Sequence, residues 1–529
     1  MRTPGLAVVG LLWLVAAEAL PAPSLPAFDF TQPGALEGWH ATHDVAPLQA
    51  VPEGMAVEIT GSDPYLTGPP RDYPPGQLLW LRLRLKSDMG GGGQVFYFTR
   101  GASEENSVRF PVRAGVWEEV RVPLPALGPG YRLRIDPPGT RGTCVIASLS
   151  FEPRTLLKEP SWPRPHPPAA PSRFLPPLRS GPAELSRNDG LGGFVVSVAG
   201  VRMAIGHSRP LIGYLHEGET RWLDLRARAR VSFHARGNGF QAVVTAPDTE
   251  GAHWRITRTF APSAIRGAFD VTTEVRVDRE RSVIFLPMLL LFPGVGSFGG
   301  ARHQGLFAGL EYLDKPDTSS SEADIIGPGS KRQVPDTLRI TFPLMAIQAA
   351  DRYVGLVWEM APYFSALFDS PDRIFGSGGH VMGVLFPGSD GVNRAEGNLL
   401  PYQGEPLKPG QPLTLRATLI AGWGKSVVPA VQQYVSVRGL PPLPGTGADV
   451  VKYSRLAAGG WLDSKIREGW RFRHAYWPGV TSFGPHPAGD APLFMEWLAG
   501  RVGDEALSAR LREGASLALA LVEPSQYDA

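Results

Sequence analysis

Leu79-Trp80-Leu81-Arg82-Leu83-Arg84-Leu85-Lys86 is the stretch of sequence that decides the fold of the first part of the chain. Leucine occupies every second position, and tryptophan, arginine or lysine fills each position between. Because successive side chains of a β-strand point to opposite faces, this period of two predicts a strand with one buried and one solvated face. Tyr131, Leu133 and Ile135 alternate with arginine and aspartate in the same way. We therefore expect a sheet whose apolar side packs against a second layer.

Short strand candidates of this kind fill residues 28–152. About eight such strands over ~125 residues are typical of a β-sandwich or jelly roll. The four glycines 90–93 lie between two candidates, and we interpret them as a hairpin loop. They are not expected to cradle a phosphate, because no helix follows them.

The rest of the chain divides into three further parts. Residues 153–183 form a proline-rich linker or surface strap, since ten prolines lie between Pro153 and Pro182. Residues 184–440 hold many longer strand candidates with few helices between them, including one over 337–343, which predicts one large antiparallel β-sandwich. Residues 441–529 change to a helical pattern, with expected helices at 449–459, 490–500 and 504–521. The predicted fold class is mainly β, with a short helical segment at the C-terminal end.

The N-terminus predicts export. Residues 1–19 have the form of a signal peptide, with an apolar run from Leu6 to Ala17 and Ala17-Glu18-Ala19 as a cleavage pattern. A single membrane anchor is the alternative, but the run is shorter than the ~20 apolar residues of a membrane span. The expected location is secreted, periplasmic or extracellular, with no membrane span after removal of the signal peptide.

Charge and motifs exclude several other classes of protein. The chain has 52 basic and 50 acidic residues and a formal net charge of +2, which gives no case for nucleic acid as a partner. Cys144 is the single cysteine, so no internal disulfide is expected, and its apolar surroundings predict a buried side chain. The sequence has no strong metal-binding motif and no nucleotide fingerprint, so we expect neither a metal nor a cofactor.

The C-terminal segment 461–479 is the most site-like stretch, because it mixes aromatic and acidic residues. Aromatic rings stack on the apolar faces of sugars, and carboxylates hold hydroxyls or transfer protons. Glu468 is the predicted acid/base residue, since nearby rings could raise its pKa by desolvation. Trp461, Asp463, His474 and Trp477 are predicted to line the same cleft and bind substrate. The alternative is that the aromatic residues only pack a junction.

Two further sets of candidates lie in the β-regions. The polar loop 311–324 carries Glu311, Glu322 and Asp324 as candidate substrate-binding residues, with a solvated connection as the alternative. The turn-rich loop 386–397 is a weaker candidate. Trp39, Tyr65 and Tyr97 are the candidates for a flat carbohydrate-binding platform, although some aromatic residues of this region must belong to the core.

The layout resembles that of two-domain glycosidases in the six-hairpin superfamily, where a galactose-mutarotase-like supersandwich precedes an (α/α)6 toroid. Phe28-Asp29-Phe30, Gly38-Trp39 and the alternating strands are similar to the jelly rolls of carbohydrate-binding modules. The resemblance implies a carbohydrate-active protein that binds a polysaccharide or oligosaccharide. Only 84 residues follow residue 445, whereas a toroid of twelve helices needs at least ~200. We therefore expect a truncated α/α domain that lacks much of the catalytic centre.

Two functions follow from these patterns. One is an exported glycoside hydrolase or polysaccharide lyase, present here as its N-terminal part. The other is a non-catalytic carbohydrate-binding or cell-surface protein. A structural module with no sugar ligand is the third interpretation. Whether the chain is an enzyme stays open from the sequence, as does its oligomeric state.

Overall fold

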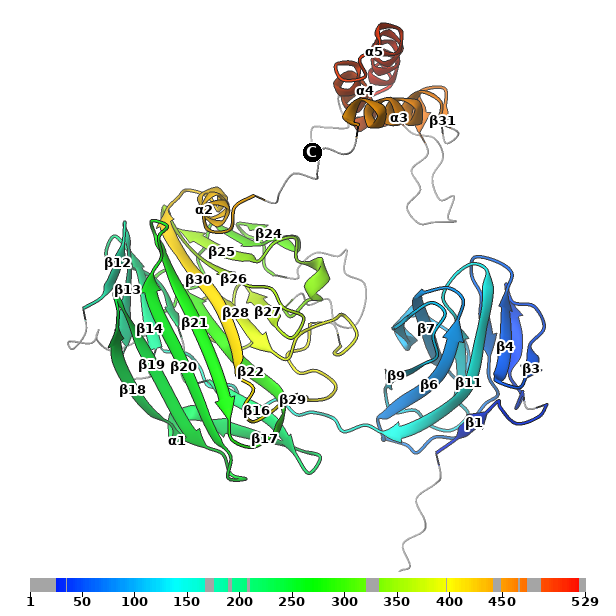
Figure 1. Ribbon diagram of the computed structural model, residues 1–529, viewed down its shortest axis with the longest axis horizontal. Coiled ribbons are helices and arrows are strands. Elements are labelled where there is room, and N and C mark those ends of the chain that lie inside the picture. The colour runs from blue at the N-terminus through cyan, green and yellow to red at the C-terminus, as the bar shows by residue number, and fades with distance from the viewer. Residues whose placement is uncertain are drawn as a thin grey trace, which may run out of the picture. The chain divides into compact units, whose positions relative to one another are not determined.

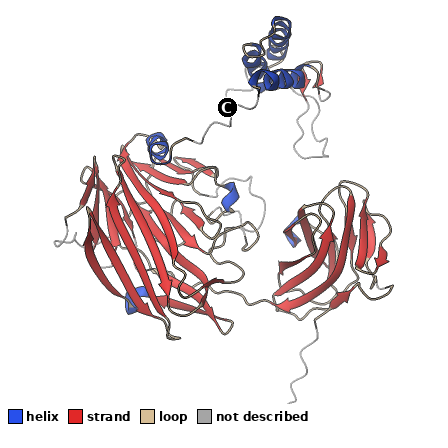
Figure 2. Ribbon diagram, in the orientation of Figure 1, coloured by secondary structure: helices blue, strands red, loops and turns tan. Residues whose placement is uncertain are grey.

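The computed structural model describes residues 25–34, 36–166, 176–188, 193–206, 210–319, 333–395, 397–440, 449–464, 467–472 and 487–522 (Figure 1). By its internal contacts the chain divides into two units. The first ends in the sequence at Arg438, and the second begins at Gly439. Strands predominate in the first unit and helices in the second, as Figure 2 shows by colour. The predicted mainly β class with antiparallel sheets and short C-terminal helices is confirmed.

The first β-region is a sandwich of two antiparallel sheets, counted over described residues 27–153. The first, called here the β6 sheet, has six strands: β3 (Gln49–Val51), β4 (Gly54–Ile59), β11 (Gly142–Pro153), β6 (Leu79–Ser87) and β9 (Glu118–Leu124) in this order, with β1 (Ala27–Asp29) also on β11. The second, the β7 sheet, has five: β2 (His40–His43), β5 (Tyr65–Thr67), β10 (Arg132–Asp136), β7 (Gly91–Phe98) and β8 (Ser107–Val112). A 3-10 helix, η1 (Glu104–Asn106), precedes β8.

The alternating stretch that predicted this sandwich forms β6. Leu79, Leu81, Leu83 and Leu85 are at most 2% exposed and belong to its core. Cys144 lies in the same core, where burial raises the pKa of its thiol to about 12 and keeps it protonated.

One loop prediction in this sandwich is wrong. Gly91, Gly92 and Gly93 belong to strand β7, where they pair with Val112, Pro111 and Phe110 of β8. The reason is steric: a Cβ at residue 93 would lie 2.6 Å from the ring of Phe110, so the ring takes the place of a side chain.

The second β-region contains two larger sheets, counted over the described residues from 178 to 423. The β22 sheet has ten strands: β12 (Leu178–Ser180), β13 (Ala183–Asn188), β14 (Gly193–Val198), β15 (Val201–Gly206), β22 (Arg281–Pro293), β16 (Leu211–His216) and β17 (Glu219–Asp224), together with β27 (Ser365–Asp369), β28 (Val381–Phe386) and β29 (Glu405–Leu407). The β30 sheet has nine: β18 (Arg230–Arg236), β19 (Gly239–Pro247), β20 (His253–Pro262), β21 (Ala268–Val277), β30 (Leu413–Trp423), β26 (Arg352–Trp358), β25 (Leu344–Ala349), β23 (Gln304–Phe307) and β24 (Glu311–Asp314).

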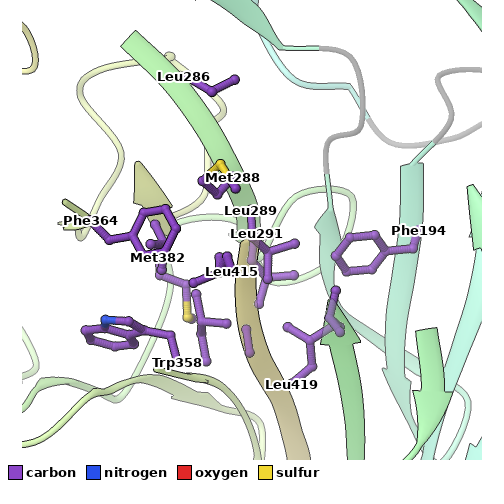
Figure 3. Packing of buried hydrophobic residues seen from close by; sticks show 14 of the residues in the cluster. Phe194, Leu286, Met288, Leu289, Leu291, Trp358, Phe364, Met382, Leu415 and Leu419 are labelled. Atoms are coloured by element: carbon purple, nitrogen blue, oxygen red, sulfur yellow. The ribbon is translucent and has the colours of Figure 1, made fainter. Parts of the chain in front are cut away.

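The core of this region lies between the two sheets, and Figure 3 shows part of it around Met288, Leu291, Trp358 and Leu419. A β-bulge lies beside Pro287 of β22, and the backbone carbonyls of residues 287 and 288 accept from a side chain of the opposite sheet. Arg258 from the opposite sheet donates to both carbonyls at 3.1–3.5 Å. Its guanidinium is therefore a structural cap inside the core, where burial lowers the pKa of Arg258 to about 10.

Helices in this region correct two expectations. Residues 337–339 form a 3-10 helix, η2 (Thr337–Arg339), because the Asp336 carboxylate accepts from the Leu338 N–H and caps it. Helix α2 (Val428–Arg438) was missed, and it packs on the β30 sheet, where Tyr353 Oη donates to Gln433 Oε1 at 2.7 Å. A short helix, α1 (Leu225–Arg228), follows β17.

The second unit holds three helices in its described residues: α3 (Val450–Leu462), α4 (Asp490–Ala499) and α5 (Glu505–Leu519). They lie where the sequence predicts helices. Asp449 and Asp504 cap two of them by accepting from backbone N–H groups three residues on, at 3.0 and 2.9 Å. A two-residue hairpin, β31 (Arg467–Glu468) and β32 (Arg471–Phe472), follows α3.

Candidate functional site

The solvent side of the β7 sheet gathers polar and aromatic side chains from all five of its strands. Leu66, Val95, Leu133 and Ile135 point into the sandwich core. Their strand neighbours therefore point outward. We call this surface the β7 face and define it by the outward residues His43, Tyr65, Gln94, Phe96, Ser107, Arg134 and Asp136, with Asp63 beside them.

Arg134 lies at the centre of the β7 face. Its Nε and Nη2 donate to the two carboxylate oxygens of Asp136 at 2.7 and 2.6 Å. Its Cζ lies 3.5 Å from the ring centroid of Tyr65 and 4.5 Å from that of Phe96. Stacking and the bidentate bond hold the guanidinium in one orientation. Nη1 has no hydrogen-bond partner among the described residues, so its donors are available to a ligand.

Acidic and imidazole groups surround this guanidinium. Asp63 Oδ1 lies 3.6 Å from Arg134 Nη2, and the Asp63 side chain is 64% exposed. His43 stacks on Tyr65 with ring centroids 5.4 Å apart. Burial raises the pKa of the Asp136 carboxyl, against the bonds from Arg134, which lower it. A carboxylate that water solvates poorly gains from accepting a ligand hydroxyl, so Asp136 is suited to that role.

A second polar group lies on β7 and β8. Gln94 Nε2 donates to Glu104 Oε2 at 2.9 Å and to Ser107 Oγ at 2.8 Å. Phe98 and Arg132 face each other across β7 and β10 and are both half-buried. The β7 face thus offers amide, carboxylate and guanidinium groups beside aromatic rings, which is the chemistry that hydroxyl-rich ligands require.

The three predicted platform residues separate in the structure. Tyr65 belongs to the β7 face. Trp39 is 4% exposed and packs edge-on against Phe28 in the core, so its indole cannot form a surface platform. The Tyr97 side chain lies on the core side of β7, where it packs against the same apolar cluster. Burial raises the pKa of its hydroxyl.

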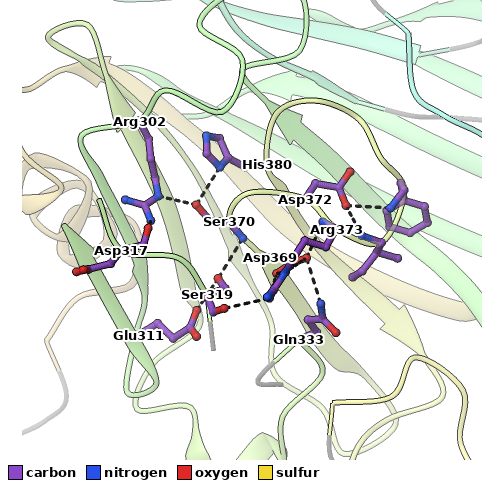
Figure 4. A network of polar contacts seen from close by, with 12 residues as sticks. Arg302, Glu311, Asp317, Ser319, Gln333, Asp369, Ser370, Asp372, Arg373 and His380 are labelled. Atoms are coloured by element: carbon purple, nitrogen blue, oxygen red, sulfur yellow. Dashed lines mark hydrogen bonds and ion pairs between the residues drawn. The ribbon is translucent and has the colours of Figure 1, made fainter. Parts of the chain in front are cut away.

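Glu311, predicted to bind substrate, lies instead in a buried network beside β27 (Figure 4). It is 6% exposed, and its carboxylate accepts from Ser319 Oγ at 2.8 Å. Ser319 Oγ accepts from the Ser370 N–H, and Ser370 Oγ accepts from Arg302 Nε at 2.6 Å. The network joins the ends of separate loops, and this explains why Glu311 is not on a solvated loop. Glu322 and Asp324 lie outside the described residues.

Ser370 and His380 in this network have the residue types of a nucleophile and its base. Ser370 Oγ lies 2.8 Å from His380 Nδ1. Both residues are 0% exposed, and burial lowers the pKa of His380 to about 3, so the imidazole stays neutral. Since no substrate reaches a pair without solvent access, we assign the pair a structural role. The loop 386–397 is likewise held from inside, because Arg394 donates to the carbonyls of Pro387, Gly388 and Leu399.

The C-terminal candidates do not come together in the described residues. Glu468 is exposed on the β31 hairpin, whereas the predicted acid/base role places it among aromatic rings in a cleft. Asp463 is 67% exposed and pairs with Arg510 at 3.2 Å. Trp461 packs against Phe472 and Phe494 at centroid distances of 5.3 and 6.1 Å, within the helical unit itself. His474 and Trp477 lie outside the described residues.

Comparisons with known proteins give weak structural likenesses. No protein-family model matches the sequence, and no curated protein matches it. The α-N-acetylgalactosaminidase NagBb from Bifidobacterium bifidum is 15% identical over 56% of this chain and 42% of its own, with a TM-score of 0.34. The chain thus spans less than half the length of that enzyme.

Two carbohydrate-binding domains also align, each over about a quarter of this chain. The C-terminal CBM6 of the laminarinase LamC from Zobellia galactanivorans is 14% identical over 24% of this chain and 97% of its own, with a TM-score of 0.19. The N-terminal cellulose-binding domain of β-1,4-glucanase C from Cellulomonas fimi is 10% identical over 23% and 93%, with a TM-score of 0.20. At these values the alignments carry no argument about function, which rests on the side chains of this chain.

None of the helices in the described residues is both long and apolar enough to cross a membrane. Within the same residues, no group of three or more His, Cys, Asp or Glu side chains is placed to hold a metal ion.

Proposed function

We propose that the chain is a carbohydrate-active protein that binds a polysaccharide or oligosaccharide on the β7 face. The observation that supports this most is the fixed Arg134 guanidinium, held by Asp136 between the rings of Tyr65 and Phe96. Vicinal hydroxyls of a sugar can accept from the free Nη1 donors while a neighbouring hydroxyl donates to a carboxylate. The Tyr65 ring gives the apolar edge against which sugar C–H groups pack.

Binding suits this face better than hydrolysis. A glycosidase needs two carboxyl groups with separate roles, one protonated and one ionised. On the β7 face Asp63 and Asp136 both lie beside the same guanidinium of Arg134. Because both carboxyl groups lie beside the same cation, the arrangement supports holding ligand hydroxyls rather than two separate catalytic roles. Our proposal for the first β-region is therefore a non-catalytic binding module.

The finer interpretations from the sequence remain proposals of lower rank. They are an exported location, directed by residues 1–19, and a relation of residues 184–529 to the N-terminal part of a six-hairpin glycosidase. The three helices described after residue 449 are the type of element with which a toroid would begin, and this is their support for the second interpretation. Neither is required for binding on the β7 face.

A glycan array on the full chain tests the proposal, with Tyr65→Ala and Tyr97→Phe as a matched pair. Tyr65 lies on the face and Tyr97 packs toward the core, so the two variants alter opposite sides of one sheet. Tyr65→Ala should lower the signal on every positive glycan, by about fivefold or more if one stacking contact is lost. Tyr97→Phe should leave it unchanged. Binding that is absent from the wild-type chain, or indifferent to Tyr65→Ala, would contradict the proposal.

A further inference from the structure

The proline-rich segment 156–166 is bound to the second β-region through a tryptophan. We call this segment the strap. Trp162 lies 4.7 Å from Phe285, 5.3 Å from Phe375 and 5.4 Å from Trp222, measured between ring centroids. These rings come from β22, β17 and the loop after β27. The strap therefore covers aromatic side chains on the outer side of the β22 sheet, away from the main core.

The groove beside Trp162 is lined almost wholly by apolar side chains. Trp162, Pro163 and Pro165 of the strap contribute part of the lining, and the rest comes from Pro210, Leu211, Phe285, Leu290, Phe292 and Phe375, around a space of about 20 Å³. That space holds about one water molecule. The indole and the prolines of the strap thus help to line an apolar groove on the second β-region.

Polar contacts fix the register of the strap. Trp162 Nε1 donates to Glu159 Oε2 at 3.0 Å, within the strap. Trp222 Nε1 donates to the Lys158 carbonyl at 3.3 Å, across the groove. A Cβ at residue 378 would lie 3.3 Å from Arg164 Nη2, so Gly378 leaves room for the strap to pass. The strap is thus held at two points, by ring packing at Trp162 and by the hydrogen bond to the Lys158 carbonyl.

We propose that this groove is a docking site for one proline-rich extended segment bearing a tryptophan, and that the strap is its intramolecular occupant. Proline-rich segments lose little conformational entropy when they bind, and aromatic grooves are the surfaces that receive them. When the strap is docked, residues 156–166 lie on the second β-region and no longer act as part of the linker. The groove belongs to the second β-region, so its occupancy can be tested independently of carbohydrate binding on the β7 face.

Limited trypsin digestion of the full chain tests the docking, with cleavage between Lys158 and Glu159 as the readout. Trp162→Ala should raise the cleavage rate at this bond at least tenfold, because the strap leaves the groove. Leu156→Ala is the matched control: Leu156 is on the same strap, is 61% exposed, and should leave the rate unchanged. Trp162→Phe keeps a ring but loses the Nε1 donor, and should give an intermediate rate even if Trp162→Ala does not fold.

A labelled peptide of residues 154–168 tests the groove itself. The Trp162→Ala chain should bind this peptide at least tenfold more tightly than the wild-type chain, whose groove its own strap fills at high effective concentration. The same peptide carrying Trp162→Ala should not bind. Wild-type cleavage rates in both Trp162 variants, with no peptide binding, would overturn the proposal. A wild-type dimer that becomes monomeric on Trp162→Ala would overturn the intramolecular assignment, because the strap would then occupy the groove of a second copy.

Discussion

The β7 face and the buried network beside β27 contain the same kinds of side chain, yet they differ in their access to water. On the β7 face the side chain of His43 is 52% exposed and that of Asp63 is 64% exposed. In the buried network His380, Ser370 and Asp369 are all 0% exposed. The comparison shows that a serine, histidine and carboxylate close together do not define a site unless a ligand can reach them. Exposed groups can exchange water for ligand, whereas buried groups are committed to one another.

The largest expected effect is on stability and belongs to the buried network. The Asp369 carboxylate accepts from the Gln333 side chain and from the backbone and guanidinium of Arg373. Asp369→Ala should cost roughly 2–3 kcal/mol of the unfolding free energy of the second β-region, because the Gln333 amide and the Arg373 N–H lose their buried acceptor. Denaturant unfolding followed by tryptophan fluorescence measures this loss.

The matched control for that change is Asp63→Ala, which removes a carboxylate that is 64% exposed. It should change stability by no more than about 0.5 kcal/mol. Asp369→Ala should leave glycan binding unchanged, provided that the first β-region stays folded. Equal losses of unfolding free energy in the two variants would show that solvent access does not distinguish the two clusters.

The next effect is on binding and belongs to the β7 face. Arg134→Ala removes the free Nη1 donors and leaves Asp136 half-buried without its partner. Glycan affinity should fall by about ten- to a hundredfold, which corresponds to the loss of one or two charge-assisted hydrogen bonds. Arg134→Lys should recover only part of it, because an ammonium cannot stack flat or bind bidentately. Isothermal titration with an array-positive glycan measures both variants.

Arg82→Ala is the matched control for Arg134→Ala. Arg82 is also a strand arginine with two acidic partners, Glu119 and Glu152, but it lies on the opposite sheet of the sandwich. Its removal should leave glycan affinity within about twofold of wild type. A loss of affinity from Arg82→Ala equal to that from Arg134→Ala would move the binding surface away from the β7 face.

A pH measurement sharpens the same comparison. In the folded chain burial lowers the pKa of His380 from 6.5 to about 3, whereas the unfolded chain keeps an ordinary imidazole. Between these two pH values the unfolded chain binds a proton that the folded chain does not. Stability is therefore full above pH ~6.5 and falls as the pH is lowered, by at most about 1.4 kcal/mol per pH unit.

Other groups also titrate in this range, so the test compares variants. The loss of stability between pH 7 and pH 5 should be smaller in His380→Gln than in wild type, by about 1–2 kcal/mol. An unchanged loss in His380→Gln would show that His380 can be protonated in the folded chain.

The sequence predicts much of the fold because strand periodicity is a local property. The leucines of β6 alternate in the sequence and are buried in the structure, and Cys144 was expected in the core and lies there. Gly91–Gly93 and helix α2 were missed because partners distant in the sequence decide them: the ring of Phe110 covers Gly93, and Tyr353 binds Gln433. Local composition contains neither fact.

The candidate site was less predictable for the same reason. Tyr65 could be named from its residue type, but Arg134, Asp136 and Gln94 could not. Their common surface depends on the strand order β5-β10-β7, which brings together residues about 30 to 70 positions apart. The sequence feature that indicates this surface is the set of polar residues that alternate with apolar ones from Tyr131 to Asp136. It shows which residues point outward, and it does not show which strands lie beside them.

The smallest expected effect concerns Glu468, the acid/base residue predicted from the sequence alone. The segment from Trp461 to Trp477 concentrates aromatic and acidic residues along the chain, but its described part divides between the end of α3 and a short hairpin. Glu468 is exposed there, so its carboxylate lies in contact with water and not inside a cleft. Glu468→Gln should therefore leave glycan binding unchanged and stability within about 0.5 kcal/mol of wild type. Trp461→Ala should destabilise the helical unit by roughly 1 kcal/mol without weakening glycan binding, because the half-buried indole packs against Phe472 and Phe494. Affinity on the glycan array and thermal unfolding of the same samples measure both effects. If Glu468→Gln weakened glycan binding while Arg134→Ala did not, the glycan-binding surface would lie on the C-terminal segment and not on the β7 face.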